Sequence, residues 1–170
     1  MAVLRITKHG EKVLKTVCPP ADYAALAPRL PELLRDMWAT MRAARGVGLA
    51  APQIGLSLRL AVIDTRPDGK SDPLVLINPE IVSAEGQLKD EEGCLSVPGV
   101  YSKLQRFAKV RVRALDADGK VWERTGEGLL ARAFQHEIDH LDGKLYVDRL
   151  PFEDRLRVLD VIKGVRVNWD

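Results

Sequence analysis

The chain has 170 residues, of which 46% are hydrophobic and 29% are charged, and its formal net charge is +2. This length and composition predict one globular domain, residues 1–170, that can bury a hydrophobic core. Basic residues do not cluster, which argues against a specific nucleic-acid partner. No apolar stretch approaches the roughly 20 residues that cross a bilayer, which argues against a membrane span.

The N-terminus lacks the basic and then apolar layout of a secretory signal, so we expect the protein in the cytoplasm. The two cysteines, Cys18 and Cys94, are too few for a disulfide framework. We therefore expect reduced thiols, one of which is available as a metal ligand or a nucleophile.

In the N-terminal part, Val3–Ile6 is predicted as a short strand. From about residue 26 to residue 44, apolar side chains recur close to the 3.6-residue period and predict a helix. The next segment, Gly46–Gly55, combines three glycines and a proline with small apolar residues, so we expect an irregular loop. It fits a buried turn and, equally well, a loop whose bare backbone approaches a substrate, with Gln53 as its hydrogen-bonding side chain.

The middle of the chain contains most of the predicted strands. Leu58–Asp64 and Pro73–Val82 are predicted as strands, the second broken at Asn78-Pro79. Gln87–Glu92 is polar and leads into a Gly-Cys-Leu-Ser turn. Lys109–Leu115 alternates basic and apolar residues, which is typical of a half-buried strand. The Asp-Gly pair at 118–119 predicts a hairpin turn, with a returning strand at 121–123.

The C-terminal part is predicted to be mainly helical. A helix is expected from Gly126 or Gly128 to Leu141, and its apolar residues cover so much of its circumference that we expect it to be buried on most sides. Leu145–Val147 is predicted as a short strand. A last helix is expected from Pro151, with acidic residues in its first turn, to about residue 163.

Two of the three histidines, His136 and His140, lie four residues apart in this buried helix, and Glu137 follows the first. Side chains four residues apart share one helix face, so both imidazoles can bind one metal ion while the carboxylate reaches a water beside it. Polar groups at such depth are costly unless they are paired or metal-bound. This H-E-x-x-H pattern predicts a metal centre; two core histidines hydrogen-bonded to backbone carbonyls are the alternative.

The third metal ligand is open on this reasoning, because a catalytic site usually has three protein ligands and one free position. Tyr146 stands where the extended pattern would place a third histidine. Asp160 has the spacing of an acidic third ligand, which would make the protein an internally cleaving zinc peptidase. Cys94 is the other candidate, since a thiolate with two imidazoles suits Fe(II), Zn, Ni or Co.

Three segments together resemble the signature motifs of the peptide deformylase family, in the family's order and at its usual separations. They are Gly46–Gly55 (GVGLAAPQIG), Glu92–Ser96 (EGCLS) and Gln135–Leu141 (QHEIDHL). Flanking segments also match, and the resemblance covers essentially the whole chain. It implies an enzyme that removes the N-terminal formyl group from N-formylmethionyl nascent peptides and releases formate.

The resemblance also implies roles for individual residues. The metal ligands of the family match Cys94, His136 and His140. The ion implied is one divalent metal, foremost Fe(II), with Zn, Ni or Co as substitutes. Glu137 matches the general acid/base for attack by a metal-bound water on the formyl carbon. Gln53 and the backbone N–H of Leu95 match the donors that stabilise the oxyanion.

On the substrate side, Gly48 matches a residue whose backbone holds the peptide in an extended pose. The implied pocket for the methionine side chain falls at Val47, Glu92, Leu129 and Ala133. The implied fold is α+β, with antiparallel β-sheets wrapped around a central buried helix that carries HExxH. An N-terminal helix and a short C-terminal helix complete it.

The chain departs from the family pattern at a few positions. Arg132 stands where an apolar residue is common on the catalytic helix, and we expect it to alter the pocket rim. Tyr101 and Ser102 lie in a variable segment that borders the substrate. Some bacterial members dock on the ribosome through a longer basic C-terminal helix. The C-terminal helix here is short and nearly balanced in charge, which leaves the ribosome open as a partner.

Two other functions stay as alternatives. The first is the zinc endopeptidase, which requires Asp160 rather than Cys94 for metal binding. The second is a non-catalytic domain with a closed, structural metal site. A structural site has no use for Glu137 or Gln53, which argues against this second alternative.

Overall fold

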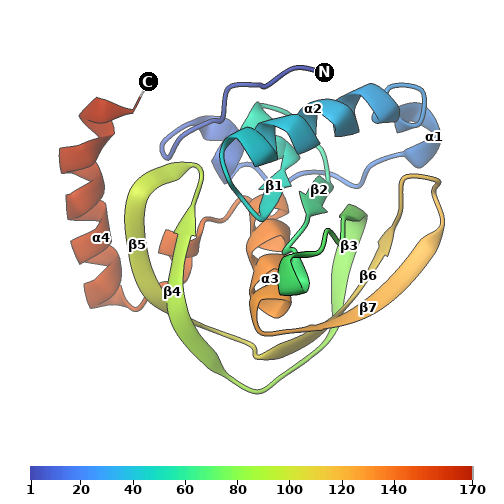
Figure 1. Cartoon of the computed structure of the whole chain (residues 1–170). Coiled ribbons are helices and arrows are strands. Elements are labelled where there is room, and N and C mark those ends of the chain that lie inside the picture. Colours follow the sequence, from blue (N-terminus) through green and yellow to red (C-terminus); the bar gives the residue numbers. More distant parts are fainter. Residues whose placement is uncertain (170) are drawn as a thin grey trace.

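The structure is a computed structural model that describes residues 1–169. Two α-helices come first in the chain, antiparallel strands follow in succession, and two more α-helices come last (Figure 1). The helices are α1 (Tyr23–Leu26), α2 (Leu30–Ala43), α3 (Leu129–Leu141) and α4 (Phe152–Val165). The strands are β1 (Gly48–Ala50), β2 (Leu60–Ile63), β3 (Leu74–Glu85), β4 (Leu88–Cys94), β5 (Val97–Arg106), β6 (Lys109–Leu115) and β7 (Val121–Glu127). The α+β class predicted from the resemblance is confirmed.

Helix α3 lies between two separate sheets (Figure 1). The larger sheet is antiparallel with the strand order β1-β2-β3-β6-β7, and the smaller one pairs β4 with β5. Apolar side chains of α3, among them Phe134, Ile138 and Leu141, pack into the core of the larger sheet. Polar side chains of the same helix bond to β4 and β5, as Arg132 does to Glu92. The two sheets thus enclose a helix that is apolar on one side and charged on the other.

The alternating pattern of β6 appears in the structure as predicted. Val110, Val112 and Ala114 are buried at 0–3% exposure, while Lys109, Arg111 and Arg113 face outward. β7 runs from Val121 to Glu127 and pairs antiparallel with β6 over its whole length. The inward residues of β6 therefore form part of the floor on which α3 rests.

The two outer helices cover different parts of the molecule. Buried residues of α2, including Leu34, Met37 and Met41, pack against β1 and β2. Helix α4 packs on β5, with Val158 and Ile162 almost fully buried. The predicted helix at 26–44 is confirmed from residue 30 onward, and the short α1 occupies the segment before Pro28.

The segment Gly46–Gly55 is more regular than predicted. Its residues 48–50 form β1, which pairs with β2, and Ala51–Ile54 form a 3₁₀ turn that ends at Gly55 with φ 86°. β1 is an edge strand, so its outer side has no partner strand within residues 1–169. A backbone edge is thereby left open beside α3.

Several predicted elements were wrong or incomplete. Val3–Ile6 is not a strand, because Leu4 N–H donates to Thr40 Oγ1 instead of to a neighbouring strand. Leu145–Val147 is not a strand either; residues 146–149 form a 3₁₀ turn. β3 runs on through Asn78, whose φ of 51° accompanies a register shift rather than an end. The strands β4 and β5 were missed.

Between residues 1 and 169, no helix has the length and hydropathy that are needed to cross a bilayer.

Candidate active site

The histidines of α3 face each other across one turn of the helix. His136 Nε2 lies 3.2 Å from His140 Nε2, and the ring centroids are 4.8 Å apart. The α3 backbone produces this pairing, because residues four apart lie on the same face. Burial lowers the pKa of His140 well below its ordinary value, so this imidazole is neutral and keeps a lone pair.

Cys94 reaches the same point from the other sheet. It ends β4, and its Sγ lies 3.4 Å from His140 Nε2. Ligand atoms of Cys94, His136 and His140 all lie within 4.8 Å of one another, the only such group of three or more found among the described residues. A thiolate with two imidazoles is a soft to borderline donor set that suits a divalent transition metal. The residues present therefore fit one metal ion.

Glu92 fixes the orientation of the first histidine. Its Oε2 lies 2.7 Å from His136 Nδ1, which leaves Nε2 of that ring directed at the cluster. Arg106 and Arg132 also donate to the Glu92 carboxylate. Burial alone would raise the pKa of Glu92, but hydrogen bonds from His136 and Arg106 hold it well below its usual range. A carboxylate behind a ligating histidine is a common arrangement that sets the tautomer and basicity of the imidazole.

Glu137 is buried beside the cluster without a hydrogen-bond partner. It is 3% exposed, and its Oε1 is unpaired in the described protein. Burial raises its pKa from 4.5 to about 7. A Cβ at position 48 would lie 2.5 Å from Glu137 Oε2, so the absence of a side chain at Gly48 leaves room for this carboxylate.

Gln53 brings an amide to the sulfur side of the cluster. Its Oε1 accepts from Ala50 N–H at 2.9 Å, which turns Nε2 toward Cys94 Sγ at 3.6 Å and Ser96 Oγ at 3.1 Å. Leu95 lies next to Cys94 in the turn between β4 and β5 and lines the same cleft. Gln53 Nε2 thus lies beside the cluster, and Leu95 follows one of its members directly in the chain.

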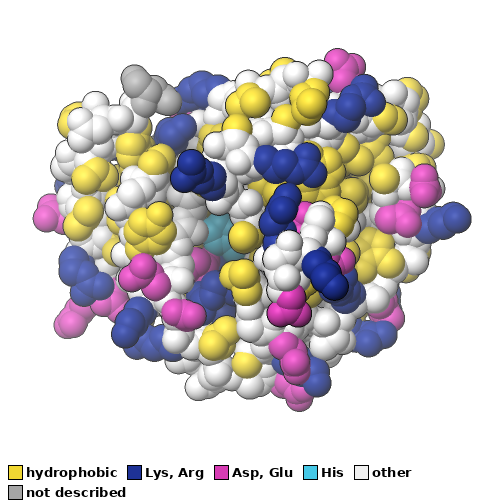
Figure 2. All heavy atoms as spheres, in the orientation of Figure 1, with side chains coloured by type: hydrophobic (Ala, Val, Ile, Leu, Met, Phe, Trp, Pro, Cys, Tyr) yellow, Lys and Arg dark blue, Asp and Glu magenta, His cyan; other side chains and the backbone are white. Residues whose placement is uncertain are grey.

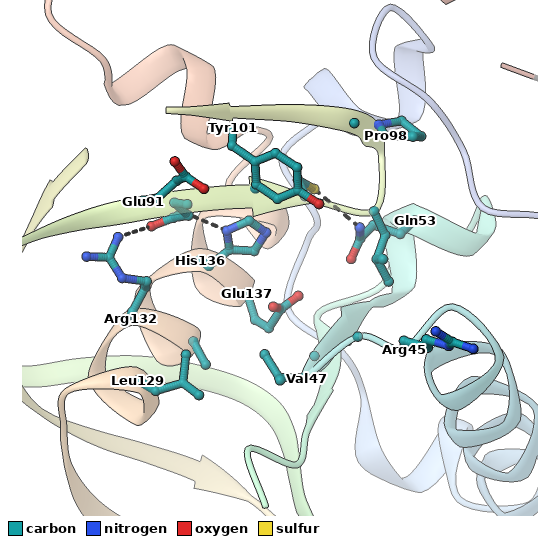
Figure 3. A pocket seen from close by; sticks show the side chains of 18 residues that line it. Arg45, Val47, Gln53, Glu91, Pro98, Tyr101, Leu129, Arg132, His136 and Glu137 are labelled. Atoms are coloured by element: carbon teal, nitrogen blue, oxygen red, sulfur yellow. Dashed lines mark hydrogen bonds and ion pairs between the residues drawn. The ribbon is translucent and has the colours of Figure 1, made fainter. Parts of the chain in front are cut away.

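A cleft of about 430 Å³ gives access to these groups. Figure 2 shows a recess on this face with a histidine side chain visible inside. Its lining includes every predicted catalytic and substrate residue, and of the predicted ligands His140 alone is absent, being fully buried beneath. In Figure 3, His136, Glu137 and Gln53 converge from α3 and the Gly46–Gly55 segment, and the Tyr101 ring lies above them.

Some contributors were not predicted from the sequence. Arg106 and Ser96 were not considered, and Arg132 was expected only at the pocket rim. The structure buries Arg132 with 6% exposure and pairs it with Glu92. Tyr101 covers Gly93, where a Cβ would lie 2.4 Å from its ring. No local pattern marks these contacts, because their partners are distant in sequence.

Neither Asp160, the alternative third ligand, nor Tyr146, which stands at the position of the expected third histidine, belongs to the cluster. Asp160 is exposed on α4 and is not among the clustered donors. Tyr146 is buried, and its hydroxyl donates to Val100 O at 2.8 Å. The geometry therefore favours Cys94 over Asp160 and weakens the endopeptidase alternative.

Known proteins resemble this chain in sequence and in overall fold. A curated peptide deformylase of Alkalilimnicola ehrlichii is 46% identical over 93% of this chain and 88% of that protein. The crystal structure of a peptide deformylase from Legionella pneumophila is 48% identical and superposes with a TM-score of 0.87 over 99% of this chain and 100% of that one. A Met-Ala-Ser-bound class I type b peptide deformylase from Acinetobacter baumannii is 37% identical, with a TM-score of 0.83 over 88% of this chain and 99% of that one. The polypeptide deformylase family model matches residues 3–155, and the chain belongs to this family.

Proposed function

We propose that this protein removes the formyl group from N-formylmethionyl nascent peptides, as a single catalytic domain of residues 1–170. The observation that carries the proposal is the convergence of three metal-ligating side chains on a buried, unpaired carboxylate at the bottom of a cleft. The ligands we assign are Cys94, His136 and His140.

The ion we propose is Fe(II), with Zn, Ni or Co as substitutes, since the donor set suits all four. When bound, such an ion acts as a Lewis acid toward a carbonyl oxygen and lowers the pKa of water. His136 is prepared for it by Glu92, which bonds its other ring nitrogen. The thiolate of Cys94 is held by Gln53 Nε2 and by Ser96 N–H at 3.4 Å.

Glu137 is proposed as the general base and then the general acid. A carboxyl with a pKa of about 7 exchanges a proton readily near neutral pH. It accepts a proton from the water that adds to the formyl carbon. It then returns that proton to the amine nitrogen as the carbon–nitrogen bond breaks, which yields formate and a free amino terminus. The unpaired Oε1 is the atom available for this transfer.

Gln53 and Leu95 are proposed to stabilise the negative oxygen that develops on the formyl carbon. Gln53 Nε2 is oriented by the bond from Ala50 N–H to Oε1, and it would exchange its contact with Cys94 Sγ or Ser96 Oγ for one to the oxyanion. Leu95 offers its backbone N–H from the adjacent turn. Removing one such preorganised donor typically costs roughly 2.7–4 kcal/mol of transition-state stabilisation.

We propose that the peptide binds along the open edge of β1. An extended peptide can add to an exposed strand edge through backbone hydrogen bonds, and Gly48 lies on that edge within the cleft. Val47, Leu129 and Ala133 offer an apolar wall of the cleft for the methionine side chain. The Met-Ala-Ser complex of the Acinetobacter baumannii relative supports a methionine-first peptide as the ligand.

Formate release from formyl-Met-Ala-Ser tests the proposal. Anaerobically prepared protein loaded with Fe(II) or Co(II) should release formate stoichiometrically with free methionine termini. Cys94→Ser should lose or alter metal binding, whereas Glu137→Gln should keep the metal and lose about a hundred-fold or more in kcat. Asp160→Ala is the matched control and should change neither property. Protein that holds the metal yet leaves the peptide formylated would contradict the proposal and favour a non-catalytic metal domain.

A further inference from the structure

Arg132 is a buried cation in the wall of the cleft, one helical turn before His136. Its side chain is 8% exposed, and Nη1 donates to Glu92 Oε1 at 2.7 Å. The backbone oxygen of Leu104 lies 3.5 Å from both terminal nitrogens of the guanidinium. The group therefore closes on β4 and β5 rather than pointing out to solvent.

The same carboxylate holds His136. Glu92 receives Arg132 on Oε1 and His136 Nδ1 on Oε2, both at 2.7 Å, and Figure 3 shows Arg132 and His136 on the same helix in the wall of the cleft. Arg106 adds two more bonds, from Nε at 3.1 Å and from Nη2 at 2.7 Å. Four donor atoms thus hold both oxygens of Glu92. Arg132 and His136 both lie on α3, whereas Arg106 lies on β5.

The balance of buried charge depends on Arg132. Arg106 is shared, because its Nη1 also bonds Asp139 Oδ2 at 2.7 Å. Without Arg132, two carboxylates at 4–7% side-chain exposure would face one buried guanidinium. Arg149 also reaches Asp139 but is 45% exposed and lies at the outer end of the network. Arg132 is therefore a second buried cation on Glu92, beside the shared Arg106.

We propose that Arg132 is a positioning residue that acts through Glu92 on His136. By holding Oε1, it keeps Oε2 aligned with Nδ1, so that Nε2 of the imidazole stays directed at the ligand cluster. Buried charge pairs are strong orienting contacts, because leaving one partner unpaired costs far more than in water. The inference rests on the proposed ligand set and adds a residue to its support.

Metal release tests this role without relying on turnover. Arg132→Met removes the donor and keeps the unbranched stem, while Arg132→Lys keeps the charge as a single-point donor. Arg113→Met is the control, since Arg113 also bonds carboxylates but on the outer face of the large sheet. Wild type and variants are loaded with Co(II), and loss to excess chelator is followed by the visible absorption of the bound ion.

Loss of a partner behind a metal ligand typically lowers metal affinity by about 10- to 100-fold. Because Arg132 is one step further out, we expect Arg132→Met to release Co(II) about three- to ten-fold faster. Arg132→Lys should fall between Arg132→Met and wild type, and Arg113→Met should match wild type. The absorption bands of the bound ion should shift in Arg132→Met.

A double-mutant cycle with Glu92→Gln decides whether the effect passes through Glu92. In that background, Arg132→Met should change the release rate no further. Additive effects would overturn the proposal. So would a raised KM or lowered melting temperature with an unchanged release rate, since those results assign Arg132 to the pocket wall or to folding alone. Failure of the wild type to bind Co(II) would instead refute the proposed ligand set.

Discussion

Replacing Glu137 by glutamine should stabilise the metal-free protein at alkaline pH. The side chain is 3% exposed and its Oε1 has no partner within the described chain, so ionising it in the folded state is unfavourable. Burial raises its pKa from 4.5 to about 7. The folded protein therefore keeps a proton between these two values that the unfolded chain releases.

This difference makes stability fall as pH rises through that window. Above about pH 7, Glu137 is ionised in both the folded and the unfolded state, and burial of its charge lowers the free energy of unfolding by about 3 kcal/mol, taking 1.36 kcal/mol for each pKa unit. Below pH 4.5 both states are protonated and the cost disappears. Glutamine carries no ionisable proton, so the variant should gain stability over wild type by up to this amount at pH 8.

Urea unfolding of chelator-treated protein at several pH values, followed by tryptophan fluorescence, measures this gain. Glu123→Gln is a suitable control, because hydrogen bonds from Arg111 lower rather than raise the pKa of that exposed carboxyl. The difference between Glu137→Gln and wild type should widen from pH 4.5 to pH 8. A difference that is constant across this range would refute the reasoning, even if the variant is inactive.

Three further outcomes are expected. Gln53→Ala should lower kcat/KM about a hundred-fold or more while Co(II) still binds, as absorption and formate assays can show; an unchanged rate would remove Gln53 from the oxyanion site. Metal affinity should rise with pH, because metal binding must displace a proton from His136. Burial opposes the charge on His136, but the Cys94 thiolate and Glu92 raise the pKa of this imidazole well above the ordinary value. Calorimetry in buffers of different ionisation enthalpy should detect that proton, and its absence would contradict the argument. Arg45→Gly should raise the free energy of unfolding by about 1 kcal/mol, because Arg45 has a φ of 58° just after α2 and glycine adopts this conformation without strain. Urea denaturation measures this change, and a lower free energy of unfolding in the variant would count against backbone strain at Arg45.

The sequence predicted the helical part of the site because its signal is local. In α3, the 3.6-residue apolar period and the spacing of His136 and His140 belong to one element, so pattern and geometry coincide. β6 was equally readable, since its alternation reflects one buried and one exposed face. Local periodicity of this kind needs no knowledge of the partner element.

The strands β4 and β5 were missed because their burial does not follow polarity. β4 reads LKDEEGC, which resembles a solvated loop, yet Glu92 is 5% exposed within a network of charges. β5 contains Pro98 and Gly99 and still alternates, with Val100, Leu104 and Arg106 among its buried positions. Sequence patterns treat charged residues as exposed, and here the charges compensate one another inside the fold.

The third metal ligand could not be predicted from local sequence patterns alone. Spacing alone left Cys94 and Asp160 as candidates; the amphipathic pattern around Asp160 favoured a surface position, and the resemblance to a known family pointed to Cys94. The structure places Cys94 at the tip of β4, opposite α3, through a pairing of β4 and β5 that no local pattern indicated. Long-range strand pairing therefore brings the Cys94 thiol to the histidines.

The three-residue length of β1 also bears on which chains the cleft can serve. An unpaired strand edge is ordinarily a hazard, because it offers main-chain bonds to any extended segment, including those of other molecules. An edge of three residues that lies within a cleft can pair with only a few residues next to a chain terminus. Under the proposed function, such pairing depends on the peptide backbone and not on side chains, so one short strand would accept nascent proteins of very different sequence beyond the first residue, and its shortness limits the edge open to aggregation.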